Sequence, residues 1–264
     1  MSVSDHAPVL LYHRISRAPV LAGTWVTPAM LERQLDLLLA QGCRPLTPAA
    51  WLALRGRPPA DSFLVTCDDG TEDLYRHREI FLQRGIKGVV FIPAALIGLC
   101  NRWEWSLPTR TARHLDFGQL RTLVDSGWEV GLHGATHRDL RRLSDAELQR
   151  ELITARVQLS EQLGTPIHLI SYPFGLVNHR VAMAVQQAEY QAGFVVASAP
   201  SGLSPRFTVR RRPVYCIDTA ESVLVKVTEP SGRTYRGRWE LLKERWAHAV
   251  GQTAAGLKGQ IAVF

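Results

Sequence analysis

Residues 63–70 read Phe-Leu-Val-Thr-Cys-Asp-Asp-Gly, a short apolar run that ends in two acids and a glycine. Four comparable apolar runs follow along the chain, at residues 88–92, 128–132, 168–172 and 193–196. Short runs that are bounded by turn signals are typical of strands buried on both faces of a sheet. The pattern therefore predicts a sheet in the interior of the molecule.

Helical patterns separate these runs, and each pattern has recognisable ends. A helix is expected over residues 27–42, because Thr-Pro opens it and glycine ends it. Another is expected over residues 144–164, which start with the capping box Ser-Asp-Ala-Glu and end at glycine. Residues 116–127 and 178–193 repeat the arrangement. Strands that alternate with helices predict an α/β protein with a mainly parallel sheet, either a barrel or an open doubly wound sheet.

Length and composition narrow the class of protein. The chain has 264 residues, of which 46% are hydrophobic and 21% charged, and these values are ordinary for a globular protein. The longest uncharged apolar run covers residues 88–100, which is shorter than the roughly 18 residues of a membrane-spanning helix. No glycine-rich phosphate loop follows the first strand, so nothing supports a nucleotide site. The four widely spaced cysteines are expected to be reduced thiols.

The two ends of the chain carry further expectations. Residues 1–6 contain no basic segment followed by an apolar stretch, so no secretory signal is expected and the protein is predicted to be cytoplasmic. Residues 1–227 are predicted to form one catalytic domain, and residues 228–264 a basic, aromatic appendage. The chain carries a net charge of +7, and much of it falls in this appendage. Peripheral contact with the inner membrane face is one interpretation, and a solvated or self-docked helix is the alternative. No nucleic-acid partner is expected.

Polar residues gather directly after the predicted strands. Asp68 and Asp69 follow the first run, and His133 and His137 follow the third. Read alone, Asp-Gly is a common turn signal, and each histidine suits a polar loop. The carboxyl ends of parallel strands share one face, however, and histidines four residues apart can hold one metal ion. Two histidines and a carboxylate predict a hydrolytic, zinc-type centre with positions open to water and substrate, and the second carboxylate is placed to accept a proton.

In their order along the chain, three motifs resemble those of the polysaccharide deacetylase family, which includes chitin- and peptidoglycan-deacetylase-like carbohydrate esterases. The motifs are Thr66–Gly70, His133–His137 and Tyr172–Gly175, and the resemblance extends over roughly residues 8–225. It implies a distorted (β/α)7-type barrel. It also implies a hydrolase that removes the N-acetyl group from a sugar of a glycan or of a lipid- or nucleotide-linked glycan precursor, and releases acetate and a free amine.

The resemblance also implies roles for individual residues. Asp68 is expected to be the general base. Asp69, His133 and His137 are expected to hold one divalent metal ion, with zinc as the expected metal. The backbone N–H of Phe174 is expected to stabilise the oxyanion of the tetrahedral intermediate.

Two more segments resemble a circularly permuted branch of the family whose enzymes act on poly-N-acetylglucosamine exopolysaccharides. The early segment Val9–Ile15 implies that His13 is the general acid that protonates the leaving amine. The late segment Arg210–Val214 implies that Arg211 braces the base aspartate. A histidine with only structural hydrogen bonds and a solvated basic strand edge are the respective alternatives.

Three aromatic residues are predicted to bind the sugar: Trp103, Trp105 and Tyr172. The two tryptophans precede the third strand, and aromatic faces stack on sugar rings. Packing of the tryptophans on the rim of the barrel is the alternative.

Two rival functions remain at this stage. The first is a hydrolase of a linear or cyclic non-sugar amide on the same scaffold, which would act without metal. The second is a glycan-binding protein with an inactive site. Retention of Asp68 and His13 favours an enzyme over the second rival.

Overall fold

The computed structural model describes residues 7–17, 23–54, 61–101, 112–196, 199–229 and 237–242. Trp103, Trp105 and most of the predicted appendage lie outside these residues. The four cysteines are all described, and none forms a disulfide. Among the described residues, no helix combines the length and the apolar character that a membrane crossing requires.

Within the described ranges, nine parallel strands form one sheet, in which the five predicted runs are neighbours. Its order is β10-β9-β8-β7-β6-β5-β1-β11, and β4 pairs with the start of β5. A separate two-stranded sheet joins β2 (Arg14–Ile15) to β3 (Trp25–Val26). The strands of the main sheet are β1 (Val9–Tyr12), β4 (Arg44–Pro45), β5 (Ser62–Cys67), β6 (Val89–Ile92), β7 (Glu129–Leu132), β8 (Leu169–Ser171), β9 (Ala192–Val195), β10 (Val209–Arg210) and β11 (Arg212–Pro213).

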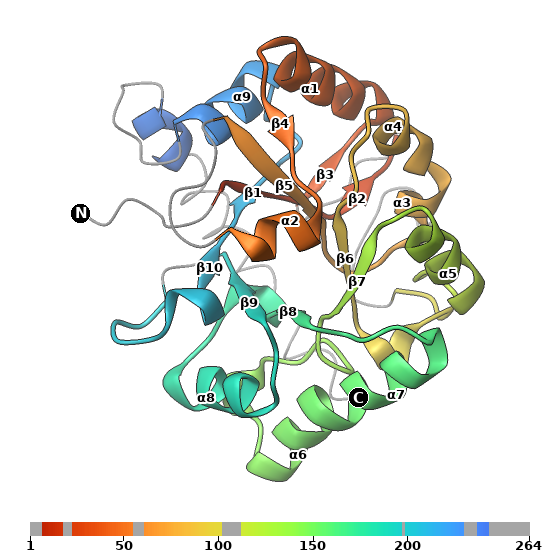
Figure 1. Ribbon diagram of the computed structural model, residues 1–264, viewed down its shortest axis with the longest axis vertical. Coiled ribbons are helices and arrows are strands. Elements are labelled where there is room, and N and C mark those ends of the chain that lie inside the picture. The colour runs from red at the N-terminus through yellow and green to blue at the C-terminus, as the bar shows by residue number, and fades with distance from the viewer. Residues whose placement is uncertain are drawn as a thin grey trace.

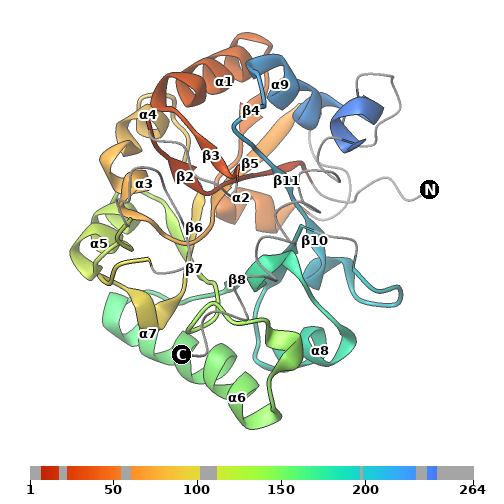
Figure 2. The same ribbon diagram turned by 180° about the vertical axis from the view of Figure 1, so that it is seen from behind.

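One short segment brings the two ends of this strand order together. β10 pairs with β9 and β11 pairs with β1, yet only Arg211 separates β10 from β11 in the sequence. The sheet therefore curls into a nearly closed barrel, with helices around its outside (Figures 1 and 2). The alternation of strands and helices allowed either a barrel or an open doubly wound sheet, and the structure confirms the barrel.

The helices begin where the capping residues predict. Thr27 accepts a hydrogen bond from Met30 N–H at the start of α1, and Asp116 and Ser144 each form a capping box. The α-helices labelled in Figure 1 are α1 (Pro28–Ala40), α2 (Pro48–Ala53), α3 (Glu72–Arg76), α4 (Arg78–Leu82), α5 (Phe117–Asp125), α6 (Asp145–Gln149), α7 (Ala155–Leu163), α8 (His179–Gln187) and α9 (Ala220–Thr228). Residues 237–242 are also helical.

Two of the predicted helices differ from the structure. The helix expected to reach residue 193 ends at Gln187, because Gly193 belongs to β9. A Cβ on Gly193 would lie 2.5 Å from the Tyr172 hydroxyl oxygen, so this glycine serves close packing rather than helix termination. The helix expected over residues 144–164 contains one π-helical stretch, η3 (Arg150–Thr154), between α6 and α7.

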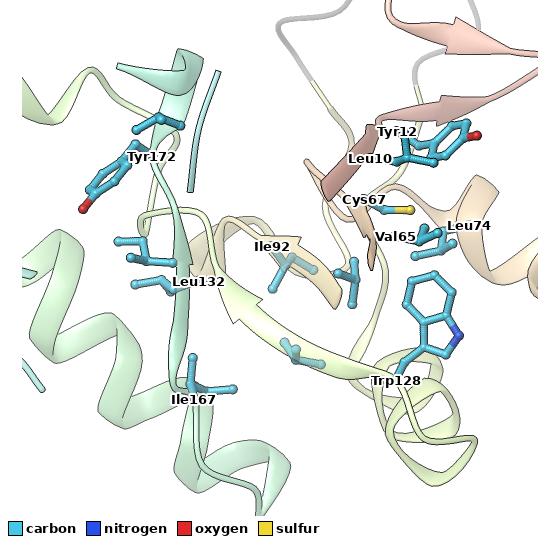
Figure 3. Close-up of a cluster of buried hydrophobic side chains, with 14 of the residues drawn as sticks. Leu10, Tyr12, Val65, Cys67, Leu74, Ile92, Trp128, Leu132, Ile167 and Tyr172 are labelled. Carbon is cyan, nitrogen blue, oxygen red and sulfur yellow. The ribbon is translucent and has the colours of Figure 1, made fainter. Parts of the chain in front are cut away.

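The alternation of side chains along the strands divides the core in two. In β5, Phe63, Val65 and Cys67 face outward and pack with the helices in one large cluster, part of which Figure 3 shows. Leu64 points to the other face, into a smaller cluster with residues of five other strands. Trp51 of α2 belongs to this inner cluster and contacts Phe194, with ring centroids 5.3 Å apart. The interior of the barrel is therefore filled with side chains on the amino-terminal side of the strand ends.

We predict that Phe194→Ala lowers the free energy of unfolding by about 3–5 kcal/mol, because it leaves a cavity between Trp51 and Phe91. Met183→Ala is the control, since Met183 is half exposed on α8 and its loss changes stability by less than about 0.5 kcal/mol. Urea denaturation followed by tryptophan fluorescence measures both. A loss below about 1 kcal/mol for Phe194→Ala would contradict an inner core packed in this way.

Candidate metal centre and active site

A buried ion pair between Asp68 and Arg211 lies inside the barrel, at the carboxyl end of β5. Both guanidinium Nη atoms donate to the carboxylate, Nη1 to Oδ1 and Nη2 to Oδ2, each at 2.7 Å. Arg211 is fully buried, and its guanidinium also lies over the rings of Phe91 and Phe194. The predicted bracing contact is therefore present, and the alternative of a solvated strand edge is wrong for this residue.

Ser171, the last residue of β8, completes this pair. Its hydroxyl oxygen lies 2.9 Å from Asp68 Oδ2 and 2.7 Å from Arg211 Nη2. Burial raises the pKa of the Asp68 carboxyl, but the Arg211 guanidinium and His133 outweigh it, so the net pKa lies well below its usual range. Asp68 is therefore held as a carboxylate with one fixed orientation.

Asp69, His133 and His137 form a compact cluster beside this pair. His133 Nε2 lies 3.6 Å and His137 Nε2 3.4 Å from Asp69 Oδ1. Three potential ligand atoms, one from each residue, lie within 4.8 Å of one another. The structure thus brings together the three predicted ligands, which come from the ends of β5 and β7.

The protonation of the histidines suits a cation at this cluster. His133 Nδ1 donates to the Ser171 carbonyl oxygen at 2.7 Å, which leaves the lone pair of Nε2 directed toward the carboxylates. Burial lowers the pKa of His133, and it lowers that of His137 further, with help from the neighbouring His133. Neutral imidazoles and a carboxylate are a donor set that a divalent ion such as zinc prefers.

The backbone at the site is strained in a consistent way. Five described non-glycine residues have a positive φ, and three of them are the site residues Asp69, His137 and Phe174. Such conformations are unfavourable for side chains with a Cβ and persist where the surrounding structure imposes them. The fold therefore holds these three residues against their local preference.

Phe174 lies in η4 (Pro173–Gly175), the turn that follows β8. This turn uses the N–H groups of Gly175 and Leu176, which donate to Tyr172 and Pro173, and not that of Phe174. The Phe174 ring packs against His137, with centroids 4.8 Å apart. The residue predicted to supply an oxyanion donor thus adjoins the predicted metal cluster.

His13 follows β1 and joins the same group of residues. The charges of Asp68, Arg211 and His133 all act on its pKa, which burial lowers to about 4. In the free protein at neutral pH, His13 is therefore uncharged. The structure brings the predicted general acid to the site, and its role in catalysis stays a prediction.

The predicted sugar-binding aromatics are not confirmed. Trp103 and Trp105 lie outside the described residues. The structure contradicts a contact between the Tyr172 side chain and substrate, because this side chain is fully buried in the outer core and its hydroxyl donates to the Phe207 carbonyl. Tyr172 points away from the barrel interior because the preceding residue, Ser171 at the end of β8, points into it.

Sequence reasoning missed Ser171 and Glu151. Ser171 ends a buried apolar strand, and a polar residue at an inward position there was a usable signal. Glu151 is a buried acid between Leu148 and Leu152 on the apolar face of a helical pattern, which was a second signal.

We predict that Arg211→Met lowers the free energy of unfolding of the metal-free protein by about 3–5 kcal/mol at pH 7, because Asp68 keeps a buried charge without its partner. Arg84→Met is the control, since Arg84 pairs with the exposed Asp36 and its loss costs less than about 1 kcal/mol.

The same pair predicts a pH dependence. The depressed pKa of Asp68 stabilises the native protein fully above about pH 5, and this contribution is lost as the pH falls. In Arg211→Met, burial instead raises the pKa of Asp68, so the stability deficit narrows toward acid pH. Urea denaturation in EDTA at pH 7 and pH 4 measures the difference, and a deficit independent of pH would refute the coupling.

Comparisons with known proteins agree with this geometry. A family model described as polysaccharide deacetylase matches residues 55–193. No curated protein sequence gave a match.

Solved structures show the same fold. The Streptococcus pyogenes deacetylase PplD, solved in complex with acetate, is 21% identical, with a TM-score of 0.70 over 86% of this chain and 100% of that one. IcaB from Ammonifex degensii is 22% identical, with a TM-score of 0.70 over 85% of this chain and 97% of that one. BC0361, a polysaccharide deacetylase from Bacillus cereus, is 22% identical, with a TM-score of 0.68 over 83% of this chain and 69% of that one.

The family match covers more than half of the chain and contains Asp68, Asp69, His133 and His137. The chain therefore belongs to the polysaccharide deacetylase family and is a hydrolase that acts on carbon–nitrogen bonds other than peptide bonds.

Proposed function

We propose that this protein removes the acetyl group from an N-acetylated sugar of a glycan or glycan precursor, with a divalent metal ion held by Asp69, His133 and His137. The observation that carries the proposal is the position of this cluster beside the Asp68 carboxylate, which Arg211 holds ionised. One group can thus hold a cation while a separate, fixed carboxylate accepts a proton.

The chemistry follows from the positions of these side chains. When bound, a divalent cation polarises a carbonyl and lowers the pKa of water from 15.7 to about 7, so a weakly basic carboxylate suffices as proton acceptor. Asp68 is that acceptor, since Arg211 and Ser171 fix its orientation. The Phe174 N–H stabilises the negative charge that develops on the acetyl oxygen, and one such donor is worth about 3 kcal/mol.

His13 supplies the proton to the leaving nitrogen. Because His13 is uncharged in the free protein, it takes up a proton from solvent within the catalytic cycle, when negative charge develops beside it, and Asp68 returns to solvent the proton that it accepted from water. An amine leaves poorly as an anion, so this proton is needed before the carbon–nitrogen bond breaks.

The finer aspects of the proposal rest on likeness. PplD is in complex with acetate, the product that this reaction releases. The segments around His13 and Arg211 favour the branch that acts on poly-N-acetylglucosamine and a role in exopolysaccharide biosynthesis. Zinc as the metal, a cytoplasmic location and peripheral membrane contact through residues 228–264 belong to the same proposal.

We predict that Asp69→Asn lowers both the bound metal and the release of acetate, whereas Asp68→Asn keeps its metal and loses turnover by about 10²–10⁴-fold. Asp36→Asn, an exposed acid on α1, is the control. Metal analysis by mass spectrometry and acetate release from N-acetylglucosamine oligomers measure the two effects.

Full activity in the presence of a strong chelator would favour the non-sugar amide hydrolase. Sugar binding without any turnover would favour the inactive glycan-binding protein.

We predict that His13→Ala lowers the turnover of an N-acetyl sugar far more than that of an aryl acetate, because a phenolate leaves without being protonated. His179→Ala, an exposed histidine on α8, is the control. Steady-state kinetics with both substrates gives the ratio. Equal losses on the two substrates would mean that His13 does not protonate the leaving group.

A further inference from the structure

A buried carboxylate holds the loop that joins the two histidines of the metal cluster. Glu151 Oε2 accepts from the N–H groups of Ala135 and Thr136, at 2.6 and 3.0 Å. Its other oxygen, Oε1, accepts from the Thr136 hydroxyl. Glu151 is only 5% exposed, and Ala135 and Thr136 lie between His133 and His137 in the sequence. The three bonds therefore fix the connection between two proposed ligands.

The helix that carries Glu151 is distorted at this residue. Glu151 belongs to the π-helical stretch η3, which interrupts the regular α-helical pattern between α6 and α7. The carbonyl of Leu152 in the same stretch accepts a hydrogen bond from the Tyr190 hydroxyl at 2.7 Å. The segment between α8 and β9 thus anchors the distorted stretch, while the Glu151 side chain reaches the loop.

The loop itself is shaped around this carboxylate. Gly134 has φ of +70°, and a Cβ at this position would lie 2.9 Å from Glu151 Oε2. His137, at the other end, has a positive φ without being glycine. The loop is thus left-handed at both ends, which costs energy at His137, and the bonds to Glu151 support this conformation.

We infer that Glu151 is a positioning residue for the metal centre: it sets the separation of His133 and His137 through the loop and so determines metal affinity. It touches neither substrate nor metal. This inference rests on the proposed metal site, because it assigns a role toward the ion that these histidines hold.

Two substitutions separate the reach of the side chain from its charge. Glu151→Asp keeps the charge but withdraws the carboxylate by one methylene, and we expect the dissociation constant for Co²⁺ to rise about 10- to 100-fold. Glu151→Gln keeps the reach, since its oxygen still accepts from both N–H groups, and we expect a smaller rise. The Co²⁺ absorption bands in the visible range report both affinity and ligand geometry in the full-length protein, without any assay of turnover.

Two control variants distinguish a local effect on the loop from a general loss of stability. Glu161→Asp makes the same change at an exposed position of α7, and its Co²⁺ affinity should equal that of the native protein. Asp218→Asn breaks the buried pair with Lys226, so it should unfold more readily and still bind Co²⁺ normally. Should Glu151→Asp fail to fold, Thr136→Val removes one of the three bonds from the exposed side of the loop and should also weaken Co²⁺ binding.

The outcomes are distinct. A native protein that binds no Co²⁺ would overturn the proposed metal site and this inference with it. A native protein that binds Co²⁺, together with unchanged affinity in Glu151→Asp or, if that variant does not fold, in Thr136→Val, would overturn the inference alone. An equal loss of affinity in Asp218→Asn would do the same, because it would trace the effect to general destabilisation.

Discussion

The Asp68–Arg211 ion pair is the interaction on which the site depends, and it exists only because the barrel closes. Arg211 lies between the two short strands at the ends of the strand order, β10 and β11, and its side chain crosses into the interior. A buried carboxylate without a partner would take up a proton. With the guanidinium bound at both oxygens, Asp68 stays ionised although it is buried.

The parity of the strands explains why polar and apolar residues occupy such different places. Leu64, Thr66 and Asp68 are two residues apart from one another, so all three point into the barrel. Leu64 therefore packs in the inner core, and Asp68 lies at the carboxyl end of the strand. Ser171 takes the equivalent place at the end of β8. A shift of one residue in either strand would turn its inward set of side chains toward the helices. The register that builds the inner core thus also builds the site.

The strained turns of the site are held by contacts with other parts of the fold. Asp69, His137 and Phe174 have unfavourable backbone conformations, and each lies in a turn between a strand and a helix. The turn that contains His137 is one example. Ala135 and Thr136 donate hydrogen bonds to Glu151, which lies in the π-helical stretch η3. A rigid arrangement of this kind suits a reaction that needs a cation, a base and an oxyanion donor at fixed positions.

The sequence by itself determined five neighbouring strands of the sheet, the starts of four helices and the residues of the Asp-His-His cluster. These features follow from local signals: apolar runs, capping residues such as Ser144, and polar residues at strand ends such as His133. It did not determine that β10 and β11 flank Arg211, since two-residue strands carry almost no pattern. It also placed Tyr172 at the site, although only packing decides that this side chain turns outward and Ser171 inward. An acid on the apolar face of a helix could mark Glu151 as buried, but only tertiary structure decided that it braces the histidine loop, because the two segments are separate in the sequence and meet in space.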